Sequence, residues 1–302
     1  MTAGCERNCM NRGFEYGRVT AACAVLTTAI SLFTAAVVNA GIPAPAATGE
    51  STPSSVTTAD LEYPTGHGPG AMTVYSPAGR ASSSAAQAIV MVHGGAWAQG
   101  SRALLDEEAR KAAAEGFVVF NIDYELAAPR NPRQHQDVTA AIDYIHAHAD
   151  DFGIAADRIG GLGTSAGAHL LMQAVTAGHA PLKAVVGWSG PYDLTVQSTP
   201  KDSALSIAAA AVHLGCVPTI GPCAELAADA SPIRHVSAGN PPVLLFNSAD
   251  EFMPVEQMTA FADRLRSVGT PAETRVIPGS KHAVAYSDAA LAPTLAFLQQ
   301  RL

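Results

Sequence analysis

Short, largely apolar runs alternate with segments of helical periodicity along most of this chain, and this alternation constrains the fold more than any other feature. Most of the runs lack the polar alternation of a half-exposed strand, so we expect them to be buried on both faces. Strands are expected over residues 71–75, 88–92, 117–122, 159–162, 182–186, 242–246 and 273–277. Helices are expected over residues 104–115, 136–148, 170–175, 255–268 and 291–302. Strands joined by helices in this order predict an α/β domain with a mostly parallel central sheet and helices on both faces.

One strand-to-helix junction has the sequence Gly163-Thr164-Ser165-Ala166-Gly167. This G-x-S-x-G pattern is typical of a sharp turn that places a nucleophilic serine at its apex. The glycines leave room for the close approach of strand and helix. The helix N-terminus then favours negative charge that develops beside the serine. The pattern predicts a nucleophile at Ser165, and the alternative is an ordinary Gly-rich turn without chemistry.

Polar residues follow three other predicted strands at their carboxyl ends. Asp250 follows the strand at 242–246, and His282 follows the strand at 273–277. The carboxyl ends of parallel strands lie at one edge of the sheet, where catalytic groups gather. The order Ser165, Asp250, His282 predicts a nucleophile, an acid and a base, in which His282 removes the serine proton and Asp250 orients the imidazole.

A Gly-rich loop, His93-Gly94-Gly95-Ala96-Trp97, follows the strand at 88–92. A tetrahedral intermediate needs backbone N–H donors directed at its oxyanion. We expect these donors to come from the Gly-rich loop and from the residue after the nucleophile, namely Gly95, Ala96 and Ala166. Other residues have competing interpretations: Glu251 is a rival to Asp250, Asp193 is a less favoured acid, and His93 and His169 are expected to be structural rather than catalytic.

These motifs resemble those of the α/β-hydrolase carboxylesterases, in the hormone-sensitive-lipase-like and related HGGxW group. The resemblance rests on His93–Trp97, Gly163–Leu170, Asp250 and His282, and it runs from about residue 70 to the C-terminus. The segment Asp123–Pro129 also resembles the Y-R-L-A-P loop of that family, with Glu125 in place of the arginine. The resemblance implies an α/β-hydrolase fold and a serine hydrolase that cleaves acyl esters of small molecules without a cofactor.

Three departures from the lipase-like branch make the compact HGGxW branch the better match. Ala96 stands where that branch has a third glycine, Thr164 stands where it often has Asp, and few residues precede His93 to form a large N-terminal cap. We therefore expect short-chain acyl or acetyl esters as substrates, with residues 191–240 forming a small cap insertion after the strand that ends near Val186. The alternatives are an amidase, formamidase or peptidase of this fold, and a non-catalytic binding protein of this fold.

The N-terminal segment has the pattern of an export signal. Arg7, Arg12 and Arg18 precede an uncharged apolar stretch, residues 19–38, which small residues follow. This pattern predicts a signal peptide over 1–40, a flexible Ala-, Pro-, Ser- and Thr-rich linker over 41–59 and a folded domain over 60–302. A secreted or cell-envelope protein without stable membrane insertion after processing is expected, and an uncleaved membrane anchor is the competing interpretation.

Cysteine usage and charge narrow the function further. Only Cys216 and Cys223 lie outside the predicted signal peptide, and an exported protein is expected to pair them in a disulfide. Their spacing is too long for a zinc knuckle, so no metal site is expected.

The formal net charge is −8 and no basic run is present, which argues against nucleic-acid binding. The sequence leaves the oligomeric state open.

Overall fold

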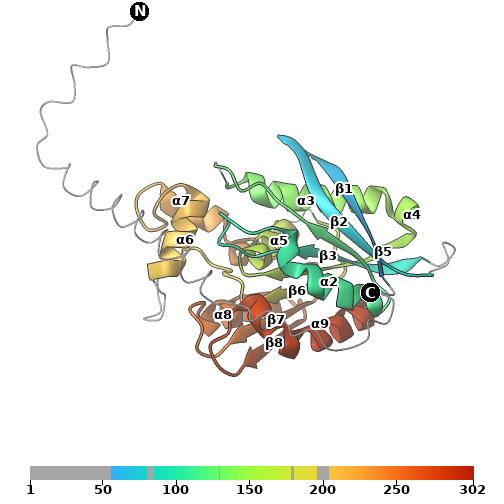
Figure 1. Ribbon diagram of the computed structural model, residues 1–302. Coiled ribbons are helices and arrows are strands. Elements are labelled where there is room, and N and C mark those ends of the chain that lie inside the picture. Colours follow the sequence, from blue (N-terminus) through green and yellow to red (C-terminus); the bar gives the residue numbers. More distant parts are fainter. Residues whose placement is uncertain (1–55, 80–84, 129, 178–179, 196–203) are drawn as a thin grey trace, which may run out of the picture. The chain divides into compact units, whose positions relative to one another are not determined.

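The computed structural model describes residues 56–79, 85–128, 130–177, 180–195 and 204–302 (Figure 1). The chain divides into two units after Gly49, and all described residues belong to the second, Glu50–Leu302. The predicted signal peptide therefore lies outside the described residues, as does the predicted linker up to residue 55. Within the described part of the chain, no helix is long and apolar enough to cross a membrane.

The described residues form a sheet of eight strands in the order β1-β2-β4-β3-β5-β6-β7-β8. The strands are β1 (Val56–Thr65), β2 (Gly68–Pro77), β3 (Ala86–Val92), β4 (Val118–Ile122), β5 (Ile154–Thr164), β6 (Val185–Trp188), β7 (Val243–Ser248) and β8 (Ala272–Ile277). Only the β1–β2 and β2–β4 pairs are antiparallel, and the other neighbours are parallel. The mostly parallel sheet predicted from the alternation of strands and helices is confirmed.

Strand β1 was not predicted, and its residues 56–59 fall in the segment predicted as linker. The linker prediction is wrong for these residues because they belong to β1, which pairs with β2 along its whole length, from Val56 opposite Pro77 to Thr65 opposite Gly68. Most of β1 is exposed at the edge of the sheet. Its order therefore comes from backbone pairing rather than from an apolar pattern that the sequence would display.

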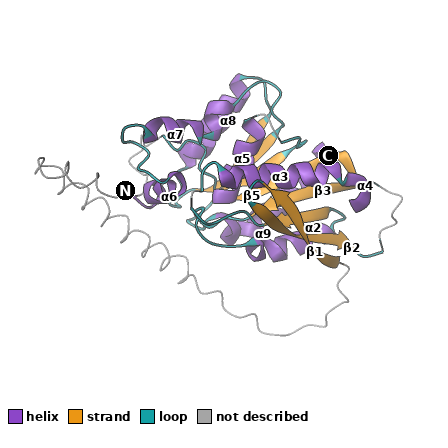
Figure 2. Cartoon of the chain, turned by 90° about the horizontal axis from the view of Figure 1, so that it is seen from above, coloured by secondary structure: helices purple, strands orange, loops and turns teal. Residues whose placement is uncertain are grey.

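Helices cover both faces of the sheet (Figure 2). The α-helices are α2 (Asp106–Ala114), α3 (Arg133–Ala147), α4 (Ala149–Phe152), α5 (Ala166–Thr176), α6 (Ala204–Leu214), α7 (Cys223–Asp229), α8 (Val255–Ser267) and α9 (Ser287–Arg301). Three 3₁₀ turns, η1 (Arg102–Leu105), η2 (Pro232–His235) and η3 (Ala283–Tyr286), complete them. Apolar residues of α3, α5 and α8 form one core, and those of α2 and α9 form the other.

Strand β3 shows how one strand supplies both cores. Its alternate residues Val90 and Val92 join the core of α3, α5 and α8, whereas Ile89 and Met91 join the core of α2 and α9. Successive side chains of a strand point to opposite faces, so a strand between two helical layers needs apolar residues on both faces. This requirement explains the continuous apolar run that identified the strand in the sequence.

The predicted insertion, residues 191–240, contains α6, α7 and η2 and no described strand. Figure 1 shows α6 and α7 together beyond one end of the sheet. The apolar, alanine-rich helix α6 was not predicted from the sequence. In the turn between α6 and α7, the structure joins Cys216 and Cys223 in a disulfide, with their Cα atoms 6.0 Å apart.

Candidate active site

Ser165 lies at the sharp turn between β5 and α5, as the sequence predicts. Its backbone has φ 52° and ψ −120°, a conformation that non-glycine residues rarely adopt. The turn is held from a neighbouring strand, because the Ser165 N–H donates to the carbonyl of Trp188 at 2.7 Å. A Cβ at Gly163 would lie 2.6 Å from the Gly167 carbonyl oxygen, and one at Gly167 would lie 2.2 Å from the Val92 carbonyl oxygen. Glycine is therefore required at both positions for the close approach of strand and helix.

His282 lies in the loop after β8 and faces Ser165. Its Nε2 atom is 2.9 Å from the Ser165 Oγ atom, and its Nδ1 atom bonds the Oε2 atom of Glu251. The imidazole side chain is 24% exposed, whereas the Glu251 side chain is fully buried. Carboxylate, imidazole and hydroxyl thus form a continuous chain of hydrogen bonds, which we call the Ser165–His282–Glu251 chain.

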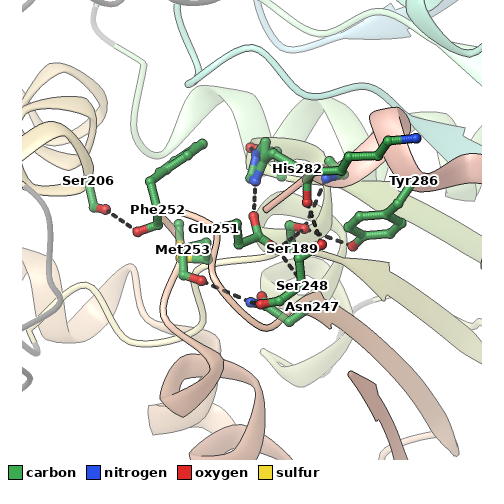
Figure 3. A network of polar contacts seen from close by, with 12 residues as sticks. Ser189, Ser206, Asn247, Ser248, Glu251, Phe252, Met253, His282 and Tyr286 are labelled. Atoms are coloured by element: carbon green, nitrogen blue, oxygen red, sulfur yellow. Dashed lines mark hydrogen bonds and ion pairs between the residues drawn. The ribbon is translucent and has the colours of Figure 1, made fainter. Parts of the chain in front are cut away.

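The expectation that Asp250 holds the imidazole is wrong, since Glu251 occupies that position. Asp250 is exposed, and its backbone N–H donates to the carbonyl of Gly279 at 3.0 Å. Both residues follow β7, and the turn there directs one side chain outward and its neighbour inward. Figure 3 shows the Glu251 carboxylate directed at His282. The sequence named Glu251 as a rival, but only the conformation of the turn distinguishes the two.

Asp193, the less favoured acid, is held elsewhere. Its carboxylate accepts the backbone N–H of Thr195 at 2.9 Å and lies 3.9 Å from the Arg234 guanidinium. Its own backbone N–H donates to the Gln257 side chain of α8 at 2.8 Å. These contacts fasten the start of the insertion to α8, so Asp193 has a structural role in this arrangement.

The Gly-rich loop after β3 passes close to the serine. A Cβ at Gly94 would lie 3.0 Å from the Ser165 Cβ atom, and one at Gly95 would lie 1.8 Å from the Gln99 carbonyl oxygen. Gly95 has φ 128°, and Ala96 and Trp97 also have positive φ, 52° and 60°. The structure thus brings the backbone of this loop to the elbow, where Ala166 follows Ser165 as the first residue of α5.

Three buried side chains behind the loop hold Trp97 in its strained conformation. The Trp97 carbonyl accepts a hydrogen bond from Gln134 Nε2 at 2.7 Å, and its indole N–H donates to His169 Nδ1 at 3.1 Å. His213 of α6 stacks on the indole with ring centroids 4.8 Å apart and bonds Gln134 Oε1 through Nδ1 at 3.0 Å. The insertion therefore supports the loop directly, through α6.

The expected structural roles of two histidines agree with these contacts. His169 Nε2 lies 2.7 Å from the carbonyl of Ala230, and because Nδ1 accepts from Trp97, Nε2 carries the proton. His93 is fully buried, with Nδ1 2.6 Å from the Gly94 carbonyl and its ring stacked on Tyr124. Sequence reasoning missed Gln134 and His213, which lie on helices whose pattern resembles ordinary packing.

The buried histidines predict that the fold loses stability in mild acid. Burial lowers the pKa of His169 from 6.5 to about 4, and it also lowers the pKa values of His93 and His213. The unfolded chain then binds more protons than the folded one, so the stability is present above about pH 6.5 and is lost as the pH falls toward 4. From His169 alone we expect a loss on the order of 3 kcal/mol in the free energy of unfolding.

Urea unfolding at a series of pH values measures this loss. The control is His169→Gln, which cannot take up a proton at this position and should show a shallower decline between pH 6.5 and 4. If the free energy of unfolding fell equally steeply with pH in the wild type and the variant, His169 would not be neutral and buried in the folded state.

No group of three or more His, Cys, Asp or Glu side chains among the described residues is arranged to hold a metal ion. The side chains that do meet at the site are a hydroxyl, an imidazole and a carboxylate. A hydroxyl bonded to an imidazole, which is itself bonded to a buried carboxylate, is the arrangement that activates a serine for attack on a carbonyl carbon.

Comparisons with known proteins show which family and fold this chain shares. The BD-FAE family model matches residues 72–265, more than half of the chain. Esterase LipC of Mycobacterium tuberculosis (strain ATCC 25618 / H37Rv) is 35% identical over 214 residues, which cover 65% of this chain and 53% of LipC. An acetyl esterase of Salmonella choleraesuis (strain SC-B67) is 29% identical over 150 residues, which cover 46% of this chain and 45% of that protein. This chain thus spans about half the length of these relatives.

A solved structure, the esterase of Pyrobaculum calidifontis in a monoclinic crystal form, superposes with a TM-score of 0.70. The superposition covers 81% of this chain and 85% of that one at 24% sequence identity. At this identity the likeness shows the fold, which is the α/β-hydrolase fold that the sequence motifs predicted. Since the family model covers most of the sheet and the elbow serine, the chain belongs to the BD-FAE family of α/β-hydrolases.

Proposed function

We propose that this protein is a serine hydrolase that cleaves carboxylic esters of small molecules through an acyl-enzyme. The observation that carries the proposal is the Ser165–His282–Glu251 chain at the carboxyl ends of the parallel strands. A serine hydroxyl becomes a useful nucleophile only when a base removes its proton, and His282 Nε2 is within hydrogen-bond reach of that proton. The names of the relatives, esterase and acetyl esterase, support the same reaction.

In the acylation step, Ser165 Oγ attacks the ester carbonyl carbon while His282 takes the hydroxyl proton. The resulting oxyanion accepts hydrogen bonds from backbone N–H groups, for which we propose Gly95, Ala96 and Ala166. The tetrahedral intermediate collapses, the bond to the alcohol oxygen breaks, and His282 returns the proton to the leaving alcohol. Water then cleaves the acyl-enzyme by the same sequence, which releases the acid and restores the serine.

Glu251 serves the imidazole rather than the substrate. Its carboxylate fixes the proton on His282 Nδ1, so that Nε2 is free to accept the proton of Ser165. The negative charge also stabilises the imidazolium that forms during each proton transfer. Because Glu251 is fully buried, little solvent screens this interaction.

We propose that short acyl chains are the preferred substrates. The insertion contributes α6, a helix of 11 residues, and α7, a helix of 7, which together make a small cap over the sheet end. We expect hydrolysis of p-nitrophenyl esters to be fastest for acetate to butyrate and to decline for longer chains. A rate that rises steadily to palmitate, or activation at a lipid interface, would contradict this preference. The p-nitroanilide with the same acyl group tests whether the site also cleaves amides.

We propose that the protein is exported, which would place the disulfide in an oxidising compartment. The basic, apolar and small-residue series at the N-terminus supports export, as does the pairing of Cys216 with Cys223. A bond that closes so short a loop contributes only about 2–3 kcal/mol through chain entropy. We therefore expect it to shape the cap more than to stabilise the fold.

A free-thiol count on the unfolded, unreduced protein from the exported fraction tests both parts of this proposal. We expect no reactive thiol in the mature chain, because Cys5, Cys9 and Cys23 would leave with the signal peptide. Reduction of the same sample is the control and should reveal two thiols per chain, a count that follows from Cys216 and Cys223. Two reactive thiols before reduction would show that the cysteines are unpaired.

A further inference from the structure

We propose that Ser189 is a positioning residue that holds Glu251 and the His282 loop in a single geometry. This inference rests on the proposed function and names a residue that it does not include. Ser189 directly follows β6, is fully buried and has φ 51°. Its backbone N–H donates to the carbonyl of Phe246 in β7 at 2.8 Å. The residue is therefore anchored to the sheet, at the edge where the Ser165–His282–Glu251 chain lies.

Three polar groups surround the Ser189 hydroxyl, as Figure 3 shows for the labelled side chains. The Oγ atom lies 2.7 Å from Glu251 Oε1, 3.0 Å from the backbone nitrogen of Ala283 and 2.8 Å from the Tyr286 hydroxyl. A hydroxyl has one proton to donate and two lone pairs to accept with. Ionised Glu251 only accepts and the Ala283 N–H only donates. The proton of Ser189 therefore goes to Glu251, and its two lone pairs face the Ala283 N–H and the Tyr286 O–H, which is shared with the Phe246 carbonyl at 3.3 Å.

This assignment leaves no hydrogen-bonding capacity of the Ser189 hydroxyl unused. Burial raises the pKa of Tyr286, which keeps its phenol protonated and able to donate. Any rotation of the Ser189 side chain would break these bonds at a position that is fully buried. Buried polar networks that are fully satisfied in this way specify one arrangement of their members.

The three bonds connect the two halves of the catalytic pair. Glu251 lies in the loop after β7, and Ala283 is the residue after His282 in the loop after β8. The Ser189 hydroxyl thus links the carboxylate to the backbone that directly follows the imidazole. Ala283 has φ 49°, so Ser189 and Ala283 are both non-glycine residues in the left-handed region. Such conformations persist only where the surroundings hold them in place, and they gather at functional sites.

The Oε1 atom of Glu251, which faces away from the imidazole, is held by two donors, of which Ser189 is one. The Oε1 atom accepts from Ser189 Oγ and from the Ser248 backbone N–H, each at 2.7 Å, while Oε2 faces His282 Nδ1. Loss of the Ser189 hydroxyl would leave the Ser248 N–H as the one donor to Oε1, so the carboxylate would be held less firmly in its bond to His282. We therefore expect fewer molecules in which imidazole and Ser165 are aligned for proton transfer.

The test is Ser189→Ala in the full chain, compared with Thr294→Val. Thr294 lies in α9, in the helical layer formed by α2 and α9. Its hydroxyl accepts the Trp188 indole N–H at 3.0 Å within the core. Both substitutions remove one buried hydroxyl, so both should lower the melting temperature. We expect Ser189→Ala to reduce kcat on the order of 10- to 100-fold with KM changed less than about threefold, as for other partners that orient a functional side chain. Thr294→Val should keep the wild-type kcat.

A pH profile supplies a readout that a merely structural role would not change. Without the hydroxyl donor, more of the negative charge on Glu251 acts on His282, and the acidic limb of the kcat/KM profile should move to higher pH.

Tyr286→Phe removes one donor to Ser189 but leaves the bond between Ser189 and Glu251, so its loss of kcat should be smaller than that of Ser189→Ala. If Ser189→Ala does not fold, Ser189→Gly suits the positive φ and also lacks the hydroxyl.

An unchanged kcat in the folded Ser189 variant, or an acidic limb that does not move, would overturn the proposal. Labelling of Ser165 by a fluorophosphonate provides an independent measure, since its rate should fall with kcat. Failure of the proposed function is distinguishable, because it would appear as ester hydrolysis that survives in Ser165→Ala, whatever the behaviour of Ser189.

Discussion

Replacement of Ser165 by alanine is expected to abolish ester hydrolysis, with kcat reduced on the order of 10⁴-fold or more. The nucleophile, base and acid act as a unit, so removal of the attacking oxygen leaves His282 and Glu251 with no proton to transfer. Hydrolysis of p-nitrophenyl acetate by purified protein measures the loss. The substitution removes one oxygen atom and keeps a Cβ in the same strained turn, so the melting temperature should change little.

A nearby serine provides the matched control. Ser280 is exposed in the loop that leads to His282, and Ser280→Ala should keep the wild-type rate. A fluorophosphonate should label the wild type and Ser280→Ala but not Ser165→Ala. If Ser165→Ala retained more than a tenth of the wild-type kcat, Ser165 would not be the nucleophile and the proposed function would have to be abandoned.

Glu251 and Asp250 are adjacent carboxylates for which the structure predicts opposite outcomes. We expect Glu251→Gln to lower kcat on the order of 10³- to 10⁴-fold, because an amide no longer fixes the imidazole proton on Nδ1 and no longer stabilises the imidazolium. Asp250→Asn should keep kcat within about threefold, since a neutral substitution of an exposed side chain has little to disturb. The two variants change the same chemical group at neighbouring positions, so each is the control for the other.

Kinetics on purified variants, with circular dichroism to confirm folding, decides between the two carboxylates. Glu251→Asp refines the test, because the shorter side chain keeps the charge but withdraws it from His282. We expect its activity to lie between that of Glu251→Gln and the wild type. An inactive Asp250→Asn together with an active Glu251→Gln would show that Asp250 is the acid and that the turn after β7 adopts another conformation in solution.

Several parts of this arrangement could be predicted from the sequence because they depend on local, one-dimensional patterns. A parallel strand between two helical layers needs apolar residues on both faces, so β3, β4 and β6 appear as short, mainly apolar runs. The elbow is equally visible, because only glycine fits at Gly163 and Gly167 where strand, helix and the neighbouring Val92 carbonyl meet. Ser165 and His282 could therefore be predicted as site residues, each from its place after a predicted strand.

Other parts were decided only by the tertiary structure. Strand β1 is ordered by its pairing with β2, and a backbone partner leaves no periodic signal in an exposed strand. The choice of Glu251 over Asp250 depends on which way one turn directs two adjacent side chains. Gln134, His213 and Ser189 act through bonds to residues far away in the sequence, and their types are common in helices and loops. The sequence thus determined the parallel strands of the sheet and the positions of Ser165 and His282, whereas contacts between distant segments, absent from any local pattern, decided which carboxylate faces His282 and which residues hold it.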